Sequence, residues 1–113
     1  MKEPGFLIRH ALDCIERIHT YTNSGQNGFV ESTLIQDAVV RNLQIMCESL
    51  SRVPEDIRNA HPHVEWRGIA GLRNILVHDY FGVDTGLVWQ VIETRLPELE
   101  SHLKSILASL KRF

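Results

Sequence analysis

The chain has 113 residues and a mass of 13.0 kDa, which fits one domain over residues 1–113 and leaves no room for a catalytic domain plus a regulatory one. Hydrophobic residues make up 43% and charged residues 23%, a composition that is typical of a globular protein and excludes a disordered chain. Twelve Lys and Arg against fourteen Asp and Glu give a net charge of −2. This balance excludes nucleic-acid binding by bulk positive charge but allows a local basic cleft.

Two cysteines, Cys14 and Cys47, stand in no metal-ligand spacing, so we expect buried thiols in a reducing compartment. The first residues, Met1–Pro4, include an acid and a proline where a signal peptide has an apolar run. No apolar stretch approaches the roughly 20 residues that span a bilayer. These observations predict a cytoplasmic protein that does not contact a membrane.

Apolar residues recur at helical spacing through most of the chain, and no strand-like alternation persists. The pattern predicts a first helix over residues 5–22, followed by a turn in the glycine- and asparagine-rich stretch 23–28. Ser32 is suited to cap a second helix from about 33 to 53, which Pro54 ends. A short turn is expected at 55–60.

A third helix is predicted over residues 65–81, with Gly82 in the place of a left-handed cap. Asp84 is suited to cap a fourth helix, and Pro97 fits the first turn of a fifth. The prediction is therefore an all-α fold, a compact bundle of four to five helices with short connections.

The predicted third helix carries most of the chemical information. On a helical wheel at about 100° per residue, its apolar positions fall on one stripe. A polar stripe lies elsewhere, and its members are Arg67, Gly71, Asn74 and His78.

Arg73 lies outside this polar stripe, near Trp66 and Val77 at the edge of the apolar sector. A cation in that position must be paired, stacked or facing a cleft, because an unpaired buried charge is costly. Periodicity alone leaves two readings open for each candidate residue. Arg73 fits a structural arginine bonded to a neighbouring helix as well as a catalytic group. His78 likewise fits a surface histidine near a helix C-terminus, where the helix dipole favours its cationic form.

The order Arg73, polar Asn74, His78 and Tyr80 at the end of a helix in a small helical chain is more specific than an isolated Arg and His. This pattern resembles the HEPN superfamily, whose motif is Arg-polar-x(3–5)-His. Within it, the chain resembles the small HepT-like toxins encoded beside minimal nucleotidyltransferases, in which the motif extends to Arg-x4-His-x-Tyr. One departure is the run at 46–49, Met-Cys-Glu-Ser, where relatives often have Gly-Glu-Ala.

The resemblance implies a metal-independent ribonuclease without a cofactor, acting as the toxin of a type II/VII toxin–antitoxin pair. It also implies neutralisation by a cognate nucleotidyltransferase antitoxin that transfers AMP to Tyr80. Two copies of the chain would form a homodimer around a two-fold axis, so that two arginines and two histidines meet in one composite site. Such a site concentrates positive charge locally despite the net charge of −2.

The implied chemistry is reasonable for these residue types. RNA carries its own nucleophile, the 2′-OH, so the enzyme must only move protons and stabilise the charged phosphate. His78 is suited to general acid–base catalysis and Arg73 to bidentate binding of phosphate oxygens. Asn74, one helical turn before His78, is a candidate to orient the imidazole or bond a phosphate oxygen, and Arg67 is a candidate RNA contact.

Several alternatives stay open at this stage. The chain fits a non-catalytic module that binds a nucleotide or substrate for a nucleotidyltransferase partner, or a purely structural helical protein. Trp66 and Trp89 are expected in the core or an interface rather than as platforms for bases, and Asp79 has no assigned role. The pair at His61 and His63 is the only close histidine pair, and a bare His-x-His is weak evidence, so we expect no metal site.

Overall fold

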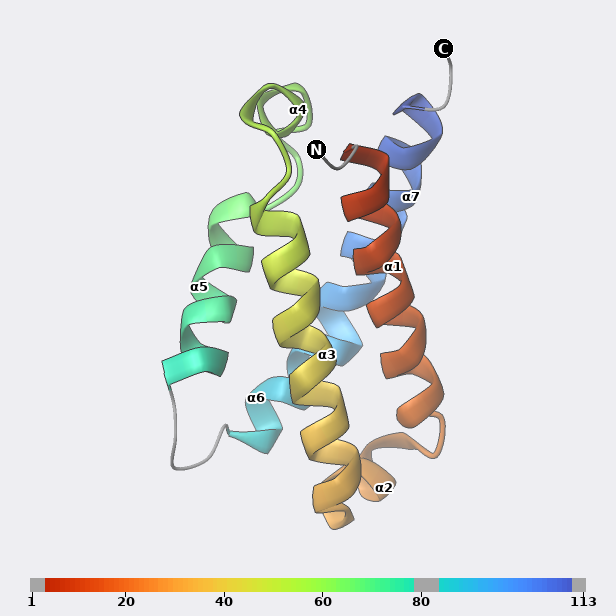
Figure 1. Ribbon diagram of the computed structural model, residues 1–113. Helices are drawn as coiled ribbons and strands as arrows, with labels where there is room; N and C mark the ends of the chain where they lie inside the picture. The colour runs from red at the N-terminus through yellow and green to blue at the C-terminus, as the bar shows by residue number, and fades with distance from the viewer. Residues whose placement is uncertain (1–3, 79–83, 111–113) are drawn as a thin grey trace.

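The computed structural model describes residues 4–78 and 84–110, and within these ranges it contains helices and no strand. The all-α prediction is confirmed. Figure 1 shows the helices as a bundle in which α3 lies between α1 and α5. The elements are α1 (Pro4–Tyr21), α2 (Gly25–Glu31), α3 (Thr33–Ser51), α4 (Glu55–Ala60), α5 (Trp66–His78), α6 (Thr85–Gln90), the π-helical segment η1 (Val91–Arg95) and α7 (Leu96–Leu110).

The core forms where α1, α3 and α7 pack together, with α5 against α3. Most of the apolar residues that recur at helical spacing in α1 and α3 are buried, and Ile69 and Leu76 of α5 are buried in the same core. Both tryptophans are half-buried and pack against this core, as predicted, and the Trp66 indole donates a hydrogen bond to the His61 carbonyl at 3.0 Å. None of the described helices is long and apolar enough to cross a membrane.

Two predicted helix caps are confirmed. The Ser32 hydroxyl accepts a hydrogen bond from the Ile35 amide at 3.1 Å, which satisfies an amide at the start of α3. The Asp84 carboxylate accepts hydrogen bonds from the Gly86 and Leu87 amides at 2.9 and 3.2 Å, at the start of α6. Local side-chain chemistry therefore fixes where both helices begin.

The two segments predicted as turns are partly helical. After a turn at Asn23 and Ser24, the chain enters α2 through Gly25, whose φ of +88° is a conformation that glycine adopts readily. The stretch 55–60 forms the short helix α4. Pro54 occupies its N-cap position, where a proline ends the preceding helix without preventing the next one from starting. The end of the third predicted helix at Gly82 lies outside the described residues.

The prediction that Pro97 lies in the first turn of a further helix is confirmed, because α7 begins at Leu96. The structure adds that no loop separates this helix from the one before it. Helical backbone continues from α6 through η1 into α7, and Leu96 immediately before the proline has helical dihedral angles of −65° and −43°. A proline has the same φ inside a helix as in a first turn. Pro97 has no amide hydrogen to donate. It lies just after the π-helical segment, where the regular hydrogen-bond pattern has already changed.

Candidate functional site

An ion pair joins α5 to α3 at the position of the predicted phosphate-binding arginine. The Nε and Nη2 atoms of Arg73 donate hydrogen bonds to one carboxylate oxygen of Glu48 at 3.0 and 2.9 Å. The side chains stay 38% and 41% exposed, so both remain in contact with solvent. A guanidinium has five N–H donors, and the bonds to Glu48 leave the others available for a ligand.

In the sequence, Glu48 stands out only as part of the run at 46–49, and no pattern predicts it as the partner of Arg73. Its neighbour Cys47 is fully buried, as is Cys14. Burial, followed by the negative charge of Glu48, raises the pKa of Cys47 from 9.0 to about 12, while Arg73 acts in the opposite direction. Cys47 is therefore an inert thiol beneath the ion pair.

The polar stripe predicted for this helix is exposed at each position whose side chain is described: Arg67, Gly71 and Asn74. Arg73 points instead toward α3, where Glu48 binds it. This is the bond to a neighbouring helix that the structural reading of Arg73 predicts, and the exposure of both side chains keeps the catalytic reading open. The structure thus separates Arg73 from Asn74 and Arg67, which lie on the outer face of α5. No ion pair among the described residues involves Arg67.

His78 is the last residue of α5, and its side chain is not described. One contact fixes the backbone just before it, because the Gln44 amide donates a hydrogen bond to the Leu76 carbonyl at 2.9 Å. The helix end that carries His78 is thereby attached to α3. Asp79 and Tyr80 lie outside the described residues.

A groove of about 690 Å³ lies between α1, α3 and α5, beside the Arg73–Glu48 pair. Its floor is the outer ridge of α3, and its walls come from α1 on one side and from Val77 of α5 on the other. We call this hollow the α3 groove. It is lined by Phe6, Leu7, His10, Arg41, Gln44, Ile45, Glu48, Ser49, Arg52 and Val77.

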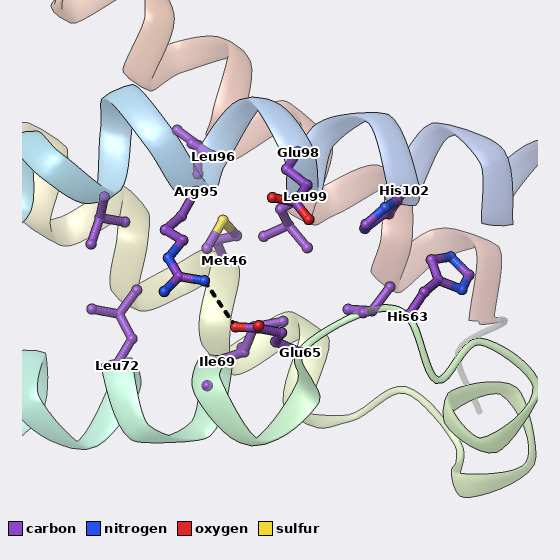
Figure 2. Close-up of a pocket in the computed structure, with 13 residues that line it drawn as sticks. Met46, His63, Glu65, Ile69, Leu72, Arg95, Leu96, Glu98, Leu99 and His102 are labelled. Atoms are coloured by element: carbon purple, nitrogen blue, oxygen red, sulfur yellow. Dashed lines mark hydrogen bonds and ion pairs between the residues drawn. The ribbon is translucent and has the colours of Figure 1, made fainter.

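A second hollow of about 240 Å³ lies on the opposite side of α5, against η1 and α7. Figure 2 shows apolar side chains such as Ile69 and Leu99 facing its interior, with charged groups at its rim. There Arg95 Nη1 donates a hydrogen bond to a Glu65 oxygen at 3.1 Å. We call it the α7 pocket.

Histidines gather near one end of the α7 pocket. The His63 and His102 rings are 4.6 Å apart between centroids, and His61 and His63 are 5.7 Å apart. Over residues 4–78 and 84–110, no group of three or more His, Cys, Asp or Glu side chains is placed to hold a metal ion.

Comparison with known proteins gives a consistent family. The model of the family described as "Ribonuclease HepT-like" matches residues 11–106. A candidate RNase of Caldanaerobacter subterraneus subsp. tengcongensis is 36% identical over 112 residues, which cover 98% of this chain and the whole of that protein. The mRNA nuclease HepT of Shewanella oneidensis is 27% identical in an alignment of 119 positions, gaps included, that covers 84% of this chain and 89% of that protein.

One further relative is longer than this chain. A protein of Methanocaldococcus jannaschii, named as a gamma-glutamylcyclotransferase and candidate RNase, is 34% identical over 112 residues, and the chain spans about half of its length. No solved structure matches significantly. The family match covers the helices that carry Arg73, Glu48 and His78, so the motif-based resemblance and the comparison agree. The chain belongs to the HepT-like ribonuclease family.

Proposed function

We propose that this protein is a metal-independent ribonuclease that acts as the toxin of a two-gene toxin–antitoxin pair. The observation that carries the proposal is the Arg73–Glu48 pair at the α3 groove, on the helix that ends at His78. A half-exposed arginine fixed by a carboxylate is oriented and still able to bind an anion. Family membership supplies the class of reaction.

In the proposed reaction, the 2′-oxygen of RNA attacks the neighbouring phosphorus while a base removes its proton. The bond between phosphorus and the 5′-oxygen breaks, and that oxygen takes up a proton. The products are a 2′,3′-cyclic phosphate and a 5′-hydroxyl, and atoms and charge balance without a metal or cofactor. His78 moves protons, Arg73 binds the phosphate oxygens, and Asn74 bonds a phosphate oxygen or orients His78.

Two proton transfers are served best by two histidines, and we propose that a second copy of the chain supplies the other. The outer face of α5 supports this part of the proposal, because it exposes Ala70, Gly71 and Asn74, and leaves Ile75 46% exposed. A Cβ added at Gly71 meets nothing within 4 Å. A surface of small residues with one exposed apolar side chain allows another helix to approach closely.

We further propose that a cognate nucleotidyltransferase neutralises the toxin at Tyr80. The tyrosine oxygen would attack the α-phosphorus of ATP, forming an O–P bond as pyrophosphate leaves and the phenol proton passes to solvent. The added AMP carries negative charge next to the catalytic helix, where it would repel RNA phosphates. Intact mass of the toxin, expressed alone and together with the nucleotidyltransferase, tests this step. Identical masses would contradict it.

The test of the main proposal is cleavage of RNA in excess chelator by the wild-type protein and by His78→Ala. We expect fragments ending in 2′,3′-cyclic phosphate from the wild type and a loss of about a hundredfold or more in the variant. Equal cleavage by both proteins would reveal a contaminating nuclease and overturn the proposal. ATP binding without any cleavage would instead support the non-catalytic nucleotide-binding module.

A further inference from the structure

The α3 groove extends well beyond the Arg73–Glu48 pair, and no feature of the proposed reaction uses its remaining side chains. Arg41 and Glu48 lie seven residues apart on α3, and Arg52 follows Glu48 by four residues as the C-cap, still in the helical region of φ and ψ, so all three lie on one face. By helical rise, Arg41 lies about 10 Å along the axis on one side of Glu48, and Arg52 about 6 Å on the other. The groove is thus long enough for several nucleotides.

These two arginines are available for a ligand. Both are exposed, both line the groove, and neither pairs with a carboxylate of the described residues, Asp37 one turn before Arg41 included. The negative charge in the groove is Glu48, which Arg73 already neutralises. The lining therefore carries an excess of positive charge, although the whole chain has a net charge of −2.

An aromatic pair forms the wall of the groove on α1. The Phe6 and His10 rings stack with centroids 6.1 Å apart and planes inclined by 5°, and Phe6 is 41% exposed. The Ser49 hydroxyl donates a hydrogen bond to the Leu7 carbonyl at 2.8 Å, which holds this wall close to the end of α3 that Arg52 caps. Cations along a groove with aromatic side chains at its edge are the usual means of binding a single strand.

We propose that the α3 groove binds single-stranded RNA on both sides of the cleaved bond. Arg41 and Arg52 contact phosphates that flank the one held by Arg73, and the Phe6–His10 pair stacks against a base at the Arg52 end. This inference rests on the proposed ribonuclease function and adds the path of the substrate. Phosphate contacts and stacking are indifferent to base identity, so we expect this path to recognise unpaired strands of any sequence.

The experiment measures binding of a labelled, uncleavable 2′-deoxy-substituted RNA to the full chain by fluorescence anisotropy over a range of salt concentrations. The test protein is the Arg41→Gln, Arg52→Gln double variant. The matched control, Arg17→Gln with Lys104→Gln, removes the same charge from exposed positions that line neither hollow. All four side chains are exposed, so both double variants are expected to fold.

We expect the groove variant to bind about 25-fold more weakly at 0.1 M salt, with a salt dependence reduced by about 1.4 in log–log slope, because each contact to single-stranded phosphate contributes about 0.7. The control variant should bind almost as the wild type does. Phe6→Ala should weaken binding about fivefold or more, and Phe6→Trp, which keeps a stacking surface, should not.

Equal affinity of the groove variant and its control would overturn the groove inference, whether or not the wild type cleaves RNA. Unchanged RNA affinity with lost binding of the nucleotidyltransferase would assign the groove to a protein partner and also overturn it. Groove-dependent binding without cleavage would contradict the proposed function and support the RNA path. Absence of any RNA binding by the wild type would overturn both.

Discussion

The described residues contain two arginine–glutamate ion pairs at α5, and these differ in geometry, exposure and surroundings. Arg73 binds Glu48 through two nitrogens, and the two side chains are 38% and 41% exposed beside the α3 groove. Arg95 binds Glu65 through one nitrogen at 3.1 Å, and those side chains are 66% and 72% exposed at the rim of the α7 pocket. The comparison shows that an ion pair alone does not identify a candidate site; the residues around the pair must also be suited to bind a ligand.

The Arg73–Glu48 pair lies beside a groove that is lined by further arginines, on the helix that ends at His78; we call this the groove side of α5. The Arg95–Glu65 pair lies at the rim of a pocket with an apolar interior; we call this the pocket side. If this difference is functional, changes near the groove should affect RNA cleavage, and equivalent changes near the pocket should not.

The largest effect is expected from Gly71→Arg on the outer face of α5. A side chain there meets nothing in the chain's own fold, but it would block close approach of a second copy. We expect a monomer in light scattering and a loss of cleavage of about a hundredfold or more, because each site would lose its second histidine. Glu98→Arg, at the rim of the α7 pocket, is the control. A dimeric or fully active Gly71→Arg protein would disprove the composite site.

A smaller effect is expected from Glu48→Gln, which keeps the shape of the side chain but removes the charge that orients Arg73. We expect kcat to fall roughly tenfold as the guanidinium loses its fixed position. Glu65→Gln removes the corresponding charge on the pocket side and should leave kcat unchanged. Steady-state cleavage of a short RNA measures both. Similar kcat values for the two variants would mean that Glu48 has no positioning role.

The groove side also contains the buried thiol of Cys47, which makes the free energy of unfolding depend on alkaline pH. Folding raises the pKa of Cys47 from 9.0 to about 12. Below pH 9 the thiol is neutral in both the folded and the unfolded chain, so its contribution to the free energy of unfolding is fully present there. Above pH 9 the unfolded chain releases its proton and the folded chain does not, so the free energy of unfolding falls.

We expect the wild type to lose about 1.4 kcal/mol more per pH unit than Cys47→Ala between pH 9 and the folded pKa. Denaturant unfolding at several pH values measures this difference. Parallel pH profiles for the two proteins would contradict the burial of this thiol.

The smallest effect concerns stability. Both ion pairs are substantially exposed, so Arg73→Ala and Arg95→Ala should each cost at most about 1 kcal/mol. Thermal unfolding of the two variants checks this. A large loss for Arg73→Ala alone would support the purely structural reading of that residue.

Periodicity and capping residues predicted most of the fold, because local chemistry decides those features. Ser32 and Asp84 cap helices whichever neighbours they have. Pro97 lies in the first turn of α7, as its fixed φ predicts, but the same φ suits a continuing helix, so the proline alone does not reveal that α6, η1 and α7 follow one another without a loop. Packing against the core, through residues such as Leu96 and Leu103, favours a helix on both sides of the proline.

The candidate site was predicted along α5 but not across to α3. The wheel indicated that Arg73 is paired, stacked or facing a cleft, and no local pattern could choose Glu48, which lies 25 residues earlier in the chain. The spacing of Arg41, Glu48 and Arg52 on one helix face was readable in the sequence. Its meaning required the position of α1 and α5 on either side of that face.

The most direct test of the central claim compares Arg73→Ala with Arg95→Ala in one assay, cleavage of single-stranded RNA in excess chelator. Each change removes an arginine from an exposed ion pair beside α5. We predict that Arg73→Ala lowers kcat/KM about a hundredfold or more and that Arg95→Ala changes it less than about twofold. Equal rates for the two variants would contradict the assignment of the groove side as the catalytic side.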